Sequence, residues 1–371
     1  MLFFLLFAYS CKKTHSSVNV IDDSTVVDTS GLIHLPIRGA DLSYLPEMNS
    51  ISTIFFDSAG AKTALQVLQE FGCNVVRVRL WHHPVYKYAG IDEVLNFCQQ
   101  ISANGMQILL DIHYSDTLAD ASRQDMPAAW AGLPFNVLKD SVRLYTQQMV
   151  RLLVNQHTPP VMVQIGNEIN NGMLWGAGKV NGTADPNWAN FADLVKSGIE
   201  GVKEIDASMP VMLHYGELNG AIDFFNNMKQ QSVPYDVIGL SYYPWNDEKD
   251  LPYLQQQLNL LAGTFNKKIL IAEMAYPFTL DGYDQTPDIV TSTSQLVPGY
   301  KATEKGQLQY MLQVKSIINA IPNQLGMGFC YWQPEWVPFK GKDATNGSAG
   351  ENTTLFDFYG MALPAMRSMA P

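Results

Sequence analysis

The sequence predicts a single (β/α)8 barrel, an α/β fold in which parallel strands alternate with helices. Short apolar runs, rich in β-branched residues, are typical of strands buried on both faces of a parallel sheet, and stretches of helical periodicity separate them. The chain has 371 residues, which fits one barrel with long loops. A doubly wound open sheet is the alternative, but no glycine-rich nucleotide-binding turn supports it.

The expected elements follow one another in βα order, and runs such as VVRVRL at 75–80 show the buried-strand pattern. The strand candidates are 34–38, 75–80, 107–113, 161–168, 211–214, 237–242, 268–273 and 326–332. Helical patterns occupy 61–71, 91–104, 137–155, 188–205, 221–229 and 305–320. Long connections at 115–134 and 274–303 follow the third and seventh strands, on the side where a barrel builds its cleft.

The chain begins with a short apolar run that ends in small residues and is followed by Cys11. Such a run is too short to span a bilayer, and it resembles a bacterial lipoprotein signal, whose cysteine becomes lipidated. We therefore expect a signal peptide at 1–10, a polar tether at 11–30 and the barrel at 31–371. The protein is expected to be exported as a cell-surface or periplasmic lipoprotein, which contacts the membrane only through a lipid on Cys11. An ordinary secretory signal, which would release the protein, is the alternative.

Composition limits the classes of partner. The net charge of −11 and the absence of a basic cluster argue against nucleic acid, whose binding depends on neutralising phosphates. A neutral polymer remains compatible, because aromatic residues make up 11% of the chain and can stack on sugars. Cys73, Cys98 and Cys330 lie in apolar segments and are expected to be small buried hydrophobes rather than disulfide partners or metal ligands.

Two glutamates stand at the ends of strand candidates, Glu168 on the fourth and Glu273 on the seventh. Because the carboxyl ends of barrel strands meet at one face, these side chains are expected to face each other. Glycoside hydrolysis needs one acid to protonate the leaving oxygen and a second carboxylate on the opposite side of the sugar. The pair therefore indicates a glycoside hydrolase, and the alternative is two unrelated loop-facing acids.

Five residues near strand ends are candidate parts of the same site. Arg79 would hold a catalytic carboxylate ionised, and the Tyr242 phenol would orient the nucleophile. Asn167 and His113 would contact the sugar through hydrogen bonds, and the Trp332 indole would stack on its apolar face. The structural alternatives are a solvated strand-end cation at Arg79, ordinary core positions for His113 and Trp332, and an ordinary aromatic strand end at Tyr242. No metal site is predicted at His113, because no third ligand lies at a diagnostic spacing.

Seven short segments carry a family resemblance: GADLS (39–43), RVRLW (77–81), DIHYSD (111–116), IGNEI (165–169), SYYP (241–244), EMAYP (273–277) and YWQP (331–334). In this order they resemble the endo-β-1,4-galactanases of glycoside hydrolase family 53. The resemblance implies retaining hydrolysis of β-1,4-galactan in pectin side chains, with Glu168 as acid/base and Glu273 as nucleophile. It adds Asp41 to the substrate-binding residues. A retaining enzyme would hold the two carboxyl groups about 5–5.5 Å apart, and we expect a monomer that requires no cofactor.

The chain departs from the family pattern at three positions. Leu118 stands where the family has Trp, and Gln333 and Glu335 replace the Glu and Ala of the eighth-strand segment. An acidic side chain has thus moved by two positions, which would change a hydrogen bond near the site.

Calcium is the cofactor that the resemblance raises, because some bacterial relatives hold it in the loop after the seventh strand. Here that loop offers only Asp281, Asp284 and Asp288, so calcium is weakly supported. Two alternatives to the galactanase interpretation stand. Another retaining barrel glycosidase, a mannanase or cellulase, would share the two glutamates but not all seven segments. A surface glycan-binding protein without catalysis would gain little from both acids.

Overall fold

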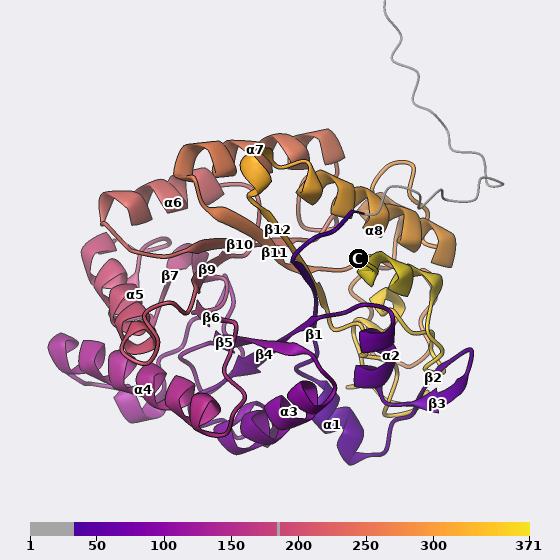
Figure 1. Ribbon diagram of the computed structural model, residues 1–371, viewed down its shortest axis with the longest axis horizontal. Helices are drawn as coiled ribbons and strands as arrows, with labels where there is room; N and C mark the ends of the chain where they lie inside the picture. Colours follow the sequence, from indigo (N-terminus) through magenta and orange to yellow (C-terminus); the bar gives the residue numbers. More distant parts are fainter. Residues whose placement is uncertain (1–32, 184–185) are drawn as a thin grey trace, which may run out of the picture. The chain divides into compact units, whose positions relative to one another are not determined.

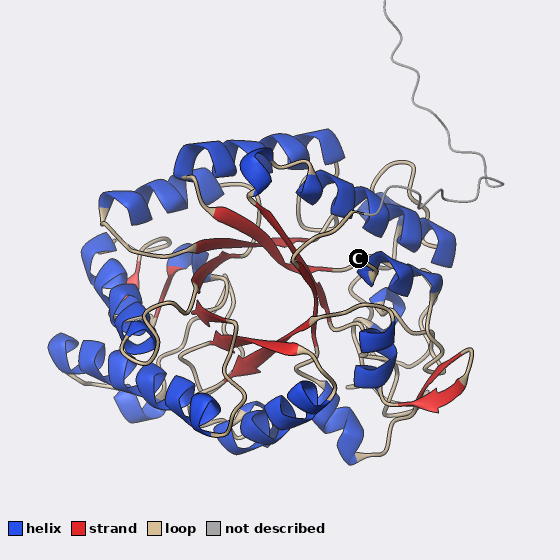
Figure 2. Cartoon of the chain, viewed as in Figure 1, coloured by secondary structure: helices blue, strands red, loops and turns tan. Residues whose placement is uncertain are grey.

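The computed structural model describes residues 33–183 and 186–371, and the predicted signal, Cys11 and tether lie outside them. Eight parallel strands close into a barrel in the order β1-β12-β11-β10-β9-β6-β5-β4, and helices surround it (Figure 1, Figure 2). The predicted (β/α)8 fold is confirmed. The barrel strands are β1 (Ile37–Asp41), β4 (Val75–Leu80), β5 (Gln107–Ile112), β6 (Met162–Ile165), β9 (Val211–Tyr215), β10 (Val237–Tyr242), β11 (Lys268–Met274) and β12 (Gly326–Trp332).

Two short antiparallel pairs lie outside the barrel: β2 (Phe55–Asp57) with β3 (Gly60–Lys62), and β7 (Gly172–Met173) with β8 (Gly178–Lys179). The helices are α1 (Leu45–Ser50), α2 (Ala64–Glu70), α3 (Ile91–Ala103), α4 (Phe135–Asn155), α5 (Trp188–Lys203), α6 (Ala221–Gln230), α7 (Leu251–Phe265) and α8 (Glu304–Asn319). Most predicted helices lie within a few residues of these bounds.

Local chemistry explains where the predicted boundaries differ. Helix α2 begins at Ala64 rather than at 61, because the β2–β3 pair precedes it and Thr63 forms a capping box with Gln66. Helix α7 was not predicted. It buries Leu254, Leu258 and Leu261 at helical spacing.

Two strand corrections affect the site. The first strand is Ile37–Asp41 rather than 34–38, which places Asp41 at its carboxyl end. The fourth strand ends at Ile165 and does not reach Glu168, because Gly166 and Glu168 adopt positive φ angles of 75° and 45°. Glu168 is therefore a loop residue just above the strand end.

The barrel interior is layered. Its lower layer is apolar and consists of Ile37, Val75, Leu109, Met162, Met212, Val237, Leu270, Ala272 and Cys330. Side chains alternate along a strand, so the next inward position lies two residues on. On four strands that position carries a buried polar residue: Arg77, Asp111, Gln164 and His214. The barrel interior therefore has an apolar lower layer and a polar layer directly above it.

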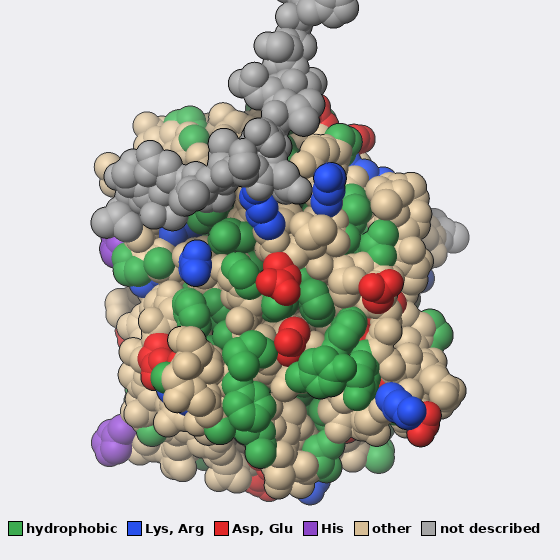
Figure 3. All heavy atoms as spheres, turned by 90° about the vertical axis from the view of Figure 1, so that its right-hand side faces the viewer, with side chains coloured by type: hydrophobic (Ala, Val, Ile, Leu, Met, Phe, Trp, Pro, Cys, Tyr) green, Lys and Arg blue, Asp and Glu red, His purple; other side chains and the backbone are tan. Residues whose placement is uncertain are grey.

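A second, larger core fills the space between the strands and the surrounding helices. On the side of the barrel that carries α2 and the β2–β3 pair, hydrophobic side chains gather between scattered acidic and basic ones (Figure 3). Large exposed hydrophobic residues near this pair include Ile54 and Met361, which bridges to Phe56. Within the described ranges, no helix is long and apolar enough to cross a membrane.

Candidate active site

A pocket opens above the polar layer, at the carboxyl ends of the strands. All eight barrel strands or the residues directly after them contribute to its wall. The long connections at 115–134 and 274–303 also contribute, through Leu118 and Ile289 among others, as expected. Of the residues predicted for the site, Tyr242 alone is absent from the lining. Those that line it are Asp41, Arg79, His113, Asn167, Glu168, Glu273 and Trp332.

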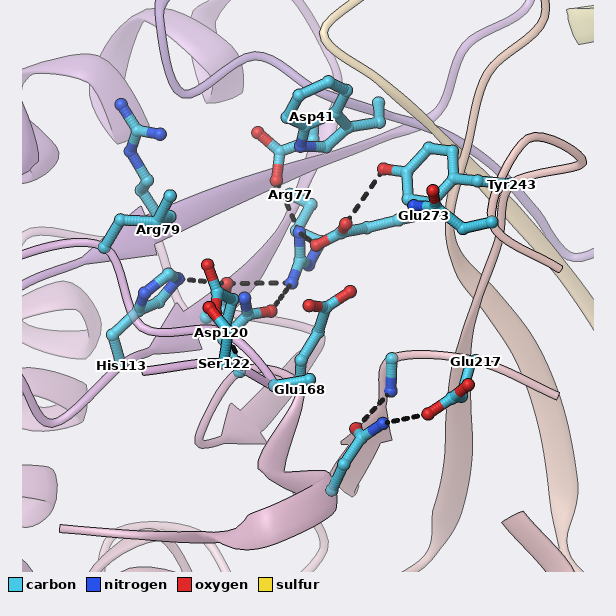
Figure 4. Close-up of a pocket in the computed structure, with 18 of the residues that line it drawn as sticks. Asp41, Arg77, Arg79, His113, Asp120, Ser122, Glu168, Glu217, Tyr243 and Glu273 are labelled. Atoms are coloured by element: carbon cyan, nitrogen blue, oxygen red, sulfur yellow. Dashed lines mark hydrogen bonds and ion pairs between the residues drawn. The ribbon is translucent and has the colours of Figure 1, made fainter. Parts of the chain in front are cut away.

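The structure brings the two predicted glutamates together. One carboxylate oxygen of Glu168 lies within 4.8 Å of one of Glu273 (Figure 4). Retaining glycosidases hold their carboxyl groups about 5–5.5 Å apart, whereas inverting enzymes leave about 6.5–9.5 Å for a water molecule. The spacing matches the retaining arrangement.

Glu168 is held as a neutral acid. Ser241 Oγ donates a hydrogen bond to its Oε1 at 2.7 Å. Gly216 leaves room for the side chain, because a Cβ at that position would lie 2.7 Å from Glu168 Cδ. Burial, and next the charge of Glu273, raises the pKa of Glu168 to about 8. The positive φ of 45° is a strained conformation of the kind that collects at functional sites.

Glu273 is held as a carboxylate. Arg77 Nη1 donates to its Oε1 at 2.7 Å, and the Tyr243 phenol donates to its Oε2 at 2.9 Å. Burial, together with the charges of Asp41 and Asp111, raises the pKa of Glu273 above its usual value. The charge of Arg77 and the Tyr243 hydrogen bond limit that rise. Among the residues that the structure describes, Glu168 has no ion pair with a cation. The proton that the pair shares therefore resides on Glu168.

Arg77 is the buried cation at the centre of the site. Besides Glu273 it contacts Asp41 Oδ2 at 2.7 Å, Asp111 Oδ2 at 2.8 Å, Gln164 Oε1 at 3.0 Å and Asn167 Oδ1 at 2.7 Å. Burial disfavours the charged guanidinium, but the surrounding carboxylates outweigh this and hold the pKa of Arg77 well above its usual value. Asp41 and Asn167, both predicted to bind substrate, are thus fixed in place by Arg77.

The prediction that Arg79 keeps the nucleophile ionised is wrong, because Arg77 does so. The two arginines are two residues apart on β4 and face the same side, but Arg79 lies roughly 6.6 Å nearer the mouth. Its guanidinium stacks over the Tyr44 ring at 4.1 Å and points away from Glu273 (Figure 4). Its Nε and Nη2 atoms have no hydrogen-bond partner within the described part of the chain, and contact with substrate stays a prediction.

The prediction that Tyr242 orients the nucleophile is also wrong, and Tyr243 takes this position. Ser241 contacts Glu168 from the barrel interior, so alternation turns Tyr242 outward and Tyr243 inward again. The Tyr242 phenol donates to the Glu248 carbonyl at 3.1 Å on the outer side. Applying the alternation from Ser241 would have identified Tyr243 from the sequence.

His113 and Trp332 line the pocket as predicted, although direct substrate contact stays a prediction. His113 Nδ1 accepts hydrogen bonds from Trp81 Nε1 at 3.3 Å and from the Ala119 amide at 3.1 Å. The ring proton is therefore on Nε2, 2.9 Å from Asp111 Oδ2. The half-buried Trp332 ring meets Tyr243 edge to face at 5.9 Å.

Sequence reasoning missed two buried residues that organise the acid/base side. His214 places Nδ1 2.9 Å from Asn167 Oδ1 and Nε2 3.0 Å from Ser241 Oγ. Burial, and next the charge of Arg77, keeps its pKa well below the usual value, so the ring is neutral. Gln164 donates to Gly166 O at 2.9 Å and fixes the turn before Glu168. His214 and Gln164 are each a lone polar residue in an otherwise apolar strand, and this pattern could have identified them from the sequence.

The departures from the family pattern have visible consequences. Gln333 is buried, and its side-chain Oε1 has no hydrogen-bond partner among the described residues, while its backbone N–H donates to Asp41 O at 3.1 Å. Glu335 is fully buried, and burial raises its pKa well above the usual value, so it is a neutral acid. Leu118 is 44% exposed in the pocket wall, where a tryptophan would offer a larger stacking face.

Two groups of side chains bear on cation binding, and among the described residues only the first has its possible ligand atoms within 4.8 Å of one another. Glu168, His214 and Glu273 lie close enough, but Arg77 already supplies positive charge to Glu273. In the loops after β11 and β12, Asp284 and Asp288 lie near Glu351, which the sequence analysis missed, whereas Asp281 is exposed beside Thr279.

The possible ligand atoms of this loop group are not all within 4.8 Å of one another, in contrast to those of the first group, but two of its oxygens lack partners in the described part of the chain. Asp288 Oδ1 and Glu351 Oε2 are buried and have no partner among the described residues. Burial, followed by the charges of Glu351 and Asp284, raises the pKa of Asp288 to about 7. Such a group favours a hard cation with oxygen ligands.

Comparison with known proteins agrees with this geometry. The sequence model that describes glycosyl hydrolase family 53 matches residues 37–369 of this chain. An arabinogalactan endo-beta-1,4-galactanase of Cellvibrio japonicus is 35% identical over 328 residues, covering 86% of each chain. The endo-beta-1,4-galactanase of Bacillus subtilis is 29% identical over 402 residues, covering 96% of this chain and 90% of that protein. The catalytic domain of a family 53 protein of Ignisphaera aggregans superposes with a TM-score of 0.84 at 32% identity, covering 90% of this chain and 95% of that one. The chain belongs to glycosyl hydrolase family 53.

Proposed function

We propose that this protein is an endo-β-1,4-galactanase that hydrolyses galactan with retention of anomeric configuration. The observation that carries the proposal is the pair of facing carboxyl groups within 4.8 Å, one beside Arg77 and the other held without a cation. Family 53 relatives named as endo-β-1,4-galactanases support the substrate.

The neighbours of the two glutamates assign their roles. Glu273 attacks the anomeric carbon while Glu168 gives its proton to the departing glycosidic oxygen, so that a glycosyl–Glu273 ester forms as the old bond breaks. Glu168, now a carboxylate, then takes a proton from water, which attacks the same carbon and releases Glu273. Arg77 and Tyr243 stabilise Glu273 as a carboxylate before the first step and after the second.

The substrate is tested by measuring reducing ends released from galactan, mannan, cellulose and arabinan. We expect turnover of galactan, and loss of long chains before small products accumulate, because the enzyme is endo-acting. Hydrolysis of mannan or cellulose with galactan left intact would favour the other retaining glycosidases. Binding of galactan without turnover would favour a glycan-binding protein.

We further propose that the protein is an exported, monomeric lipoprotein that is anchored through Cys11. The apolar run before this cysteine and the polar stretch after it support the proposal. Metabolic labelling with a radioactive fatty acid should mark the wild type and not Cys11→Ala. If both remain unlabelled and appear in the medium, the ordinary secretory signal is the correct interpretation.

No step of this reaction needs a metal, and we propose that a calcium ion, if held by Asp284, Asp288 and Glu351, has a structural role. The buried carboxylate oxygens without partners in the described ranges support this. Such an ion would join the loops after β11 and β12.

A further inference from the structure

Asp247 joins two loops beside the catalytic pair. Its Oδ2 accepts a hydrogen bond from the Tyr243 amide at 2.9 Å, and its Oδ1 accepts one from the Leu218 amide at 3.0 Å. Its own amide donates back to the Tyr243 carbonyl at 2.8 Å. One carboxylate therefore ties the loop after β10 to the loop after β9.

Each loop supports one catalytic glutamate. Tyr243 donates its phenol hydrogen to Glu273, so its backbone position determines where that hydrogen bond falls. Gly216 lies two residues before Leu218 and packs against the Glu168 side chain. Figure 4 shows Tyr243 and Glu217, one on each of the loops that Asp247 connects.

We propose that Asp247 is a positioning residue for the reaction, whose carboxylate aligns Tyr243 with Glu273 and Gly216 with Glu168. This inference rests on the proposed function. Two carboxylate oxygens accept from two backbone amides, an arrangement that the ionised group satisfies best. In asparagine the NH2 group would face one of these donors and lose that hydrogen bond, and in a neutral acid the protonated oxygen is a weaker acceptor, so one hydrogen bond is weakened.

The surroundings of Asp247 make its positioning role sensitive to pH. Burial raises the pKa of Asp247 to about 6, the two backbone hydrogen bonds oppose that rise, and the charge of Glu217 adds to it. The Tyr242 and Tyr310 phenols also face this carboxylate and remain neutral in this range. The aligned form is therefore present above a pH of about 6 and is lost as pH falls through that value.

Replacing Asp247 by asparagine tests the proposal, with Glu248→Gln as the matched control. Glu248 is the exposed neighbour, and its contact with Tyr242 uses only the backbone carbonyl. Well above pH 6, Asp247→Asn should lower kcat on galactan about tenfold, as expected for one lost buried hydrogen bond. Well below pH 6 the ratio of wild-type to variant rates should approach one, because the wild type then carries a neutral acid as well. Glu248→Gln should follow the wild type throughout.

A second variant keeps the test decisive if Asp247→Asn unfolds. Glu217→Gln removes the charge that raises the pKa of Asp247, so the midpoint of the acid limb of kcat should move to lower pH. A constant ratio of wild-type to Asp247→Asn rates across pH, or an unmoved midpoint in Glu217→Gln, would overturn the positioning role. A wild type inactive on galactan would instead refute the proposed function.

Discussion

At the residue scale, the site makes two identical side chains into different reagents. Glu273 accepts hydrogen bonds from a guanidinium and a phenol, which favour its charged form. Glu168 receives a bond from a neutral hydroxyl and faces the charge of Glu273, which disfavours ionisation. The difference between the two acids thus comes from Arg77 and Tyr243 rather than from the strands that carry them.

Substitution of each glutamate should therefore have a different effect. Glu273→Gln should abolish turnover on every substrate, because no nucleophile remains. Glu168→Ala should slow galactan hydrolysis about 10²–10⁴-fold but spare glycosylation by aryl galactosides with good leaving groups, which need little protonation. It should also remove the basic limb of the pH profile, where activity is lost as pH rises through about 8. Equal sensitivity of both variants to leaving-group pKa would contradict the assignment.

The two neighbouring tyrosines provide a matched pair. Tyr243→Phe removes the phenol donor from Glu273, so kcat should fall by roughly tenfold to a hundredfold, the range for a hydrogen bond to a charged group. Because that bond lowers the pKa of Glu273, the complete loss of activity that follows protonation of Glu273 should also move to higher pH, separately from the partial, about tenfold step assigned to Asp247. Tyr242→Phe should leave both properties unchanged, since its phenol contacts the Glu248 carbonyl. A loss of kcat in Tyr242→Phe and not in Tyr243→Phe would show that Tyr242, rather than Tyr243, orients the nucleophile.

At the scale of elements, the strand ends position the chemistry and the loops shape the cleft. Two-residue alternation on β4 and β10 explains why Arg77 and Tyr243 face Glu273 while Tyr242 does not. The loops after β5 and β11 bring Leu118 and Ile289 to the pocket wall, and the end of β12 brings Trp332.

Trp332 at the end of β12 tests the stacking prediction. Trp332→Ala should cost about 1–3 kcal/mol if a ring-sized apolar contact with the sugar is lost. The loss should appear in kcat as well as in KM, because contacts near the cleaved bond strengthen in the transition state. Trp175→Ala is the control, since Trp175 does not line the pocket. An equal effect of both variants would place Trp332 in a merely structural role.

The loops after β11 and β12 provide a separate prediction. Calcium should raise the melting temperature, and a chelator should reverse the effect, because an ion would neutralise the buried oxygens of Asp288 and Glu351. The response should weaken as pH falls through about 7 and Asp288 takes a proton. Glu351→Gln should remove it, whereas Asp281→Asn at an exposed position should not. A melting temperature indifferent to calcium would exclude the ion.

At the scale of the whole chain, the sequence supports the fold and the reaction better than the detailed contacts. The barrel and the glutamate pair were predictable because apolar runs report buried strands and both acids follow such runs. Tyr242 was chosen instead of Tyr243 because the prediction did not follow the alternation along β10. Arg79 was chosen instead of Arg77 because the two face the same side and differ only in their depth in the barrel. Glu351 could not be found, because it reaches Asp288 only through the folding of two long loops.

The central claim is a double displacement by Glu168 and Glu273, and the anomer of the first product tests it most directly. Proton NMR during early hydrolysis of β-1,4-galactan should show the β-anomer first, before mutarotation produces the α-anomer, as the separation within 4.8 Å predicts. An α-anomer formed first would contradict the mechanism, because it requires direct attack by water from the opposite face.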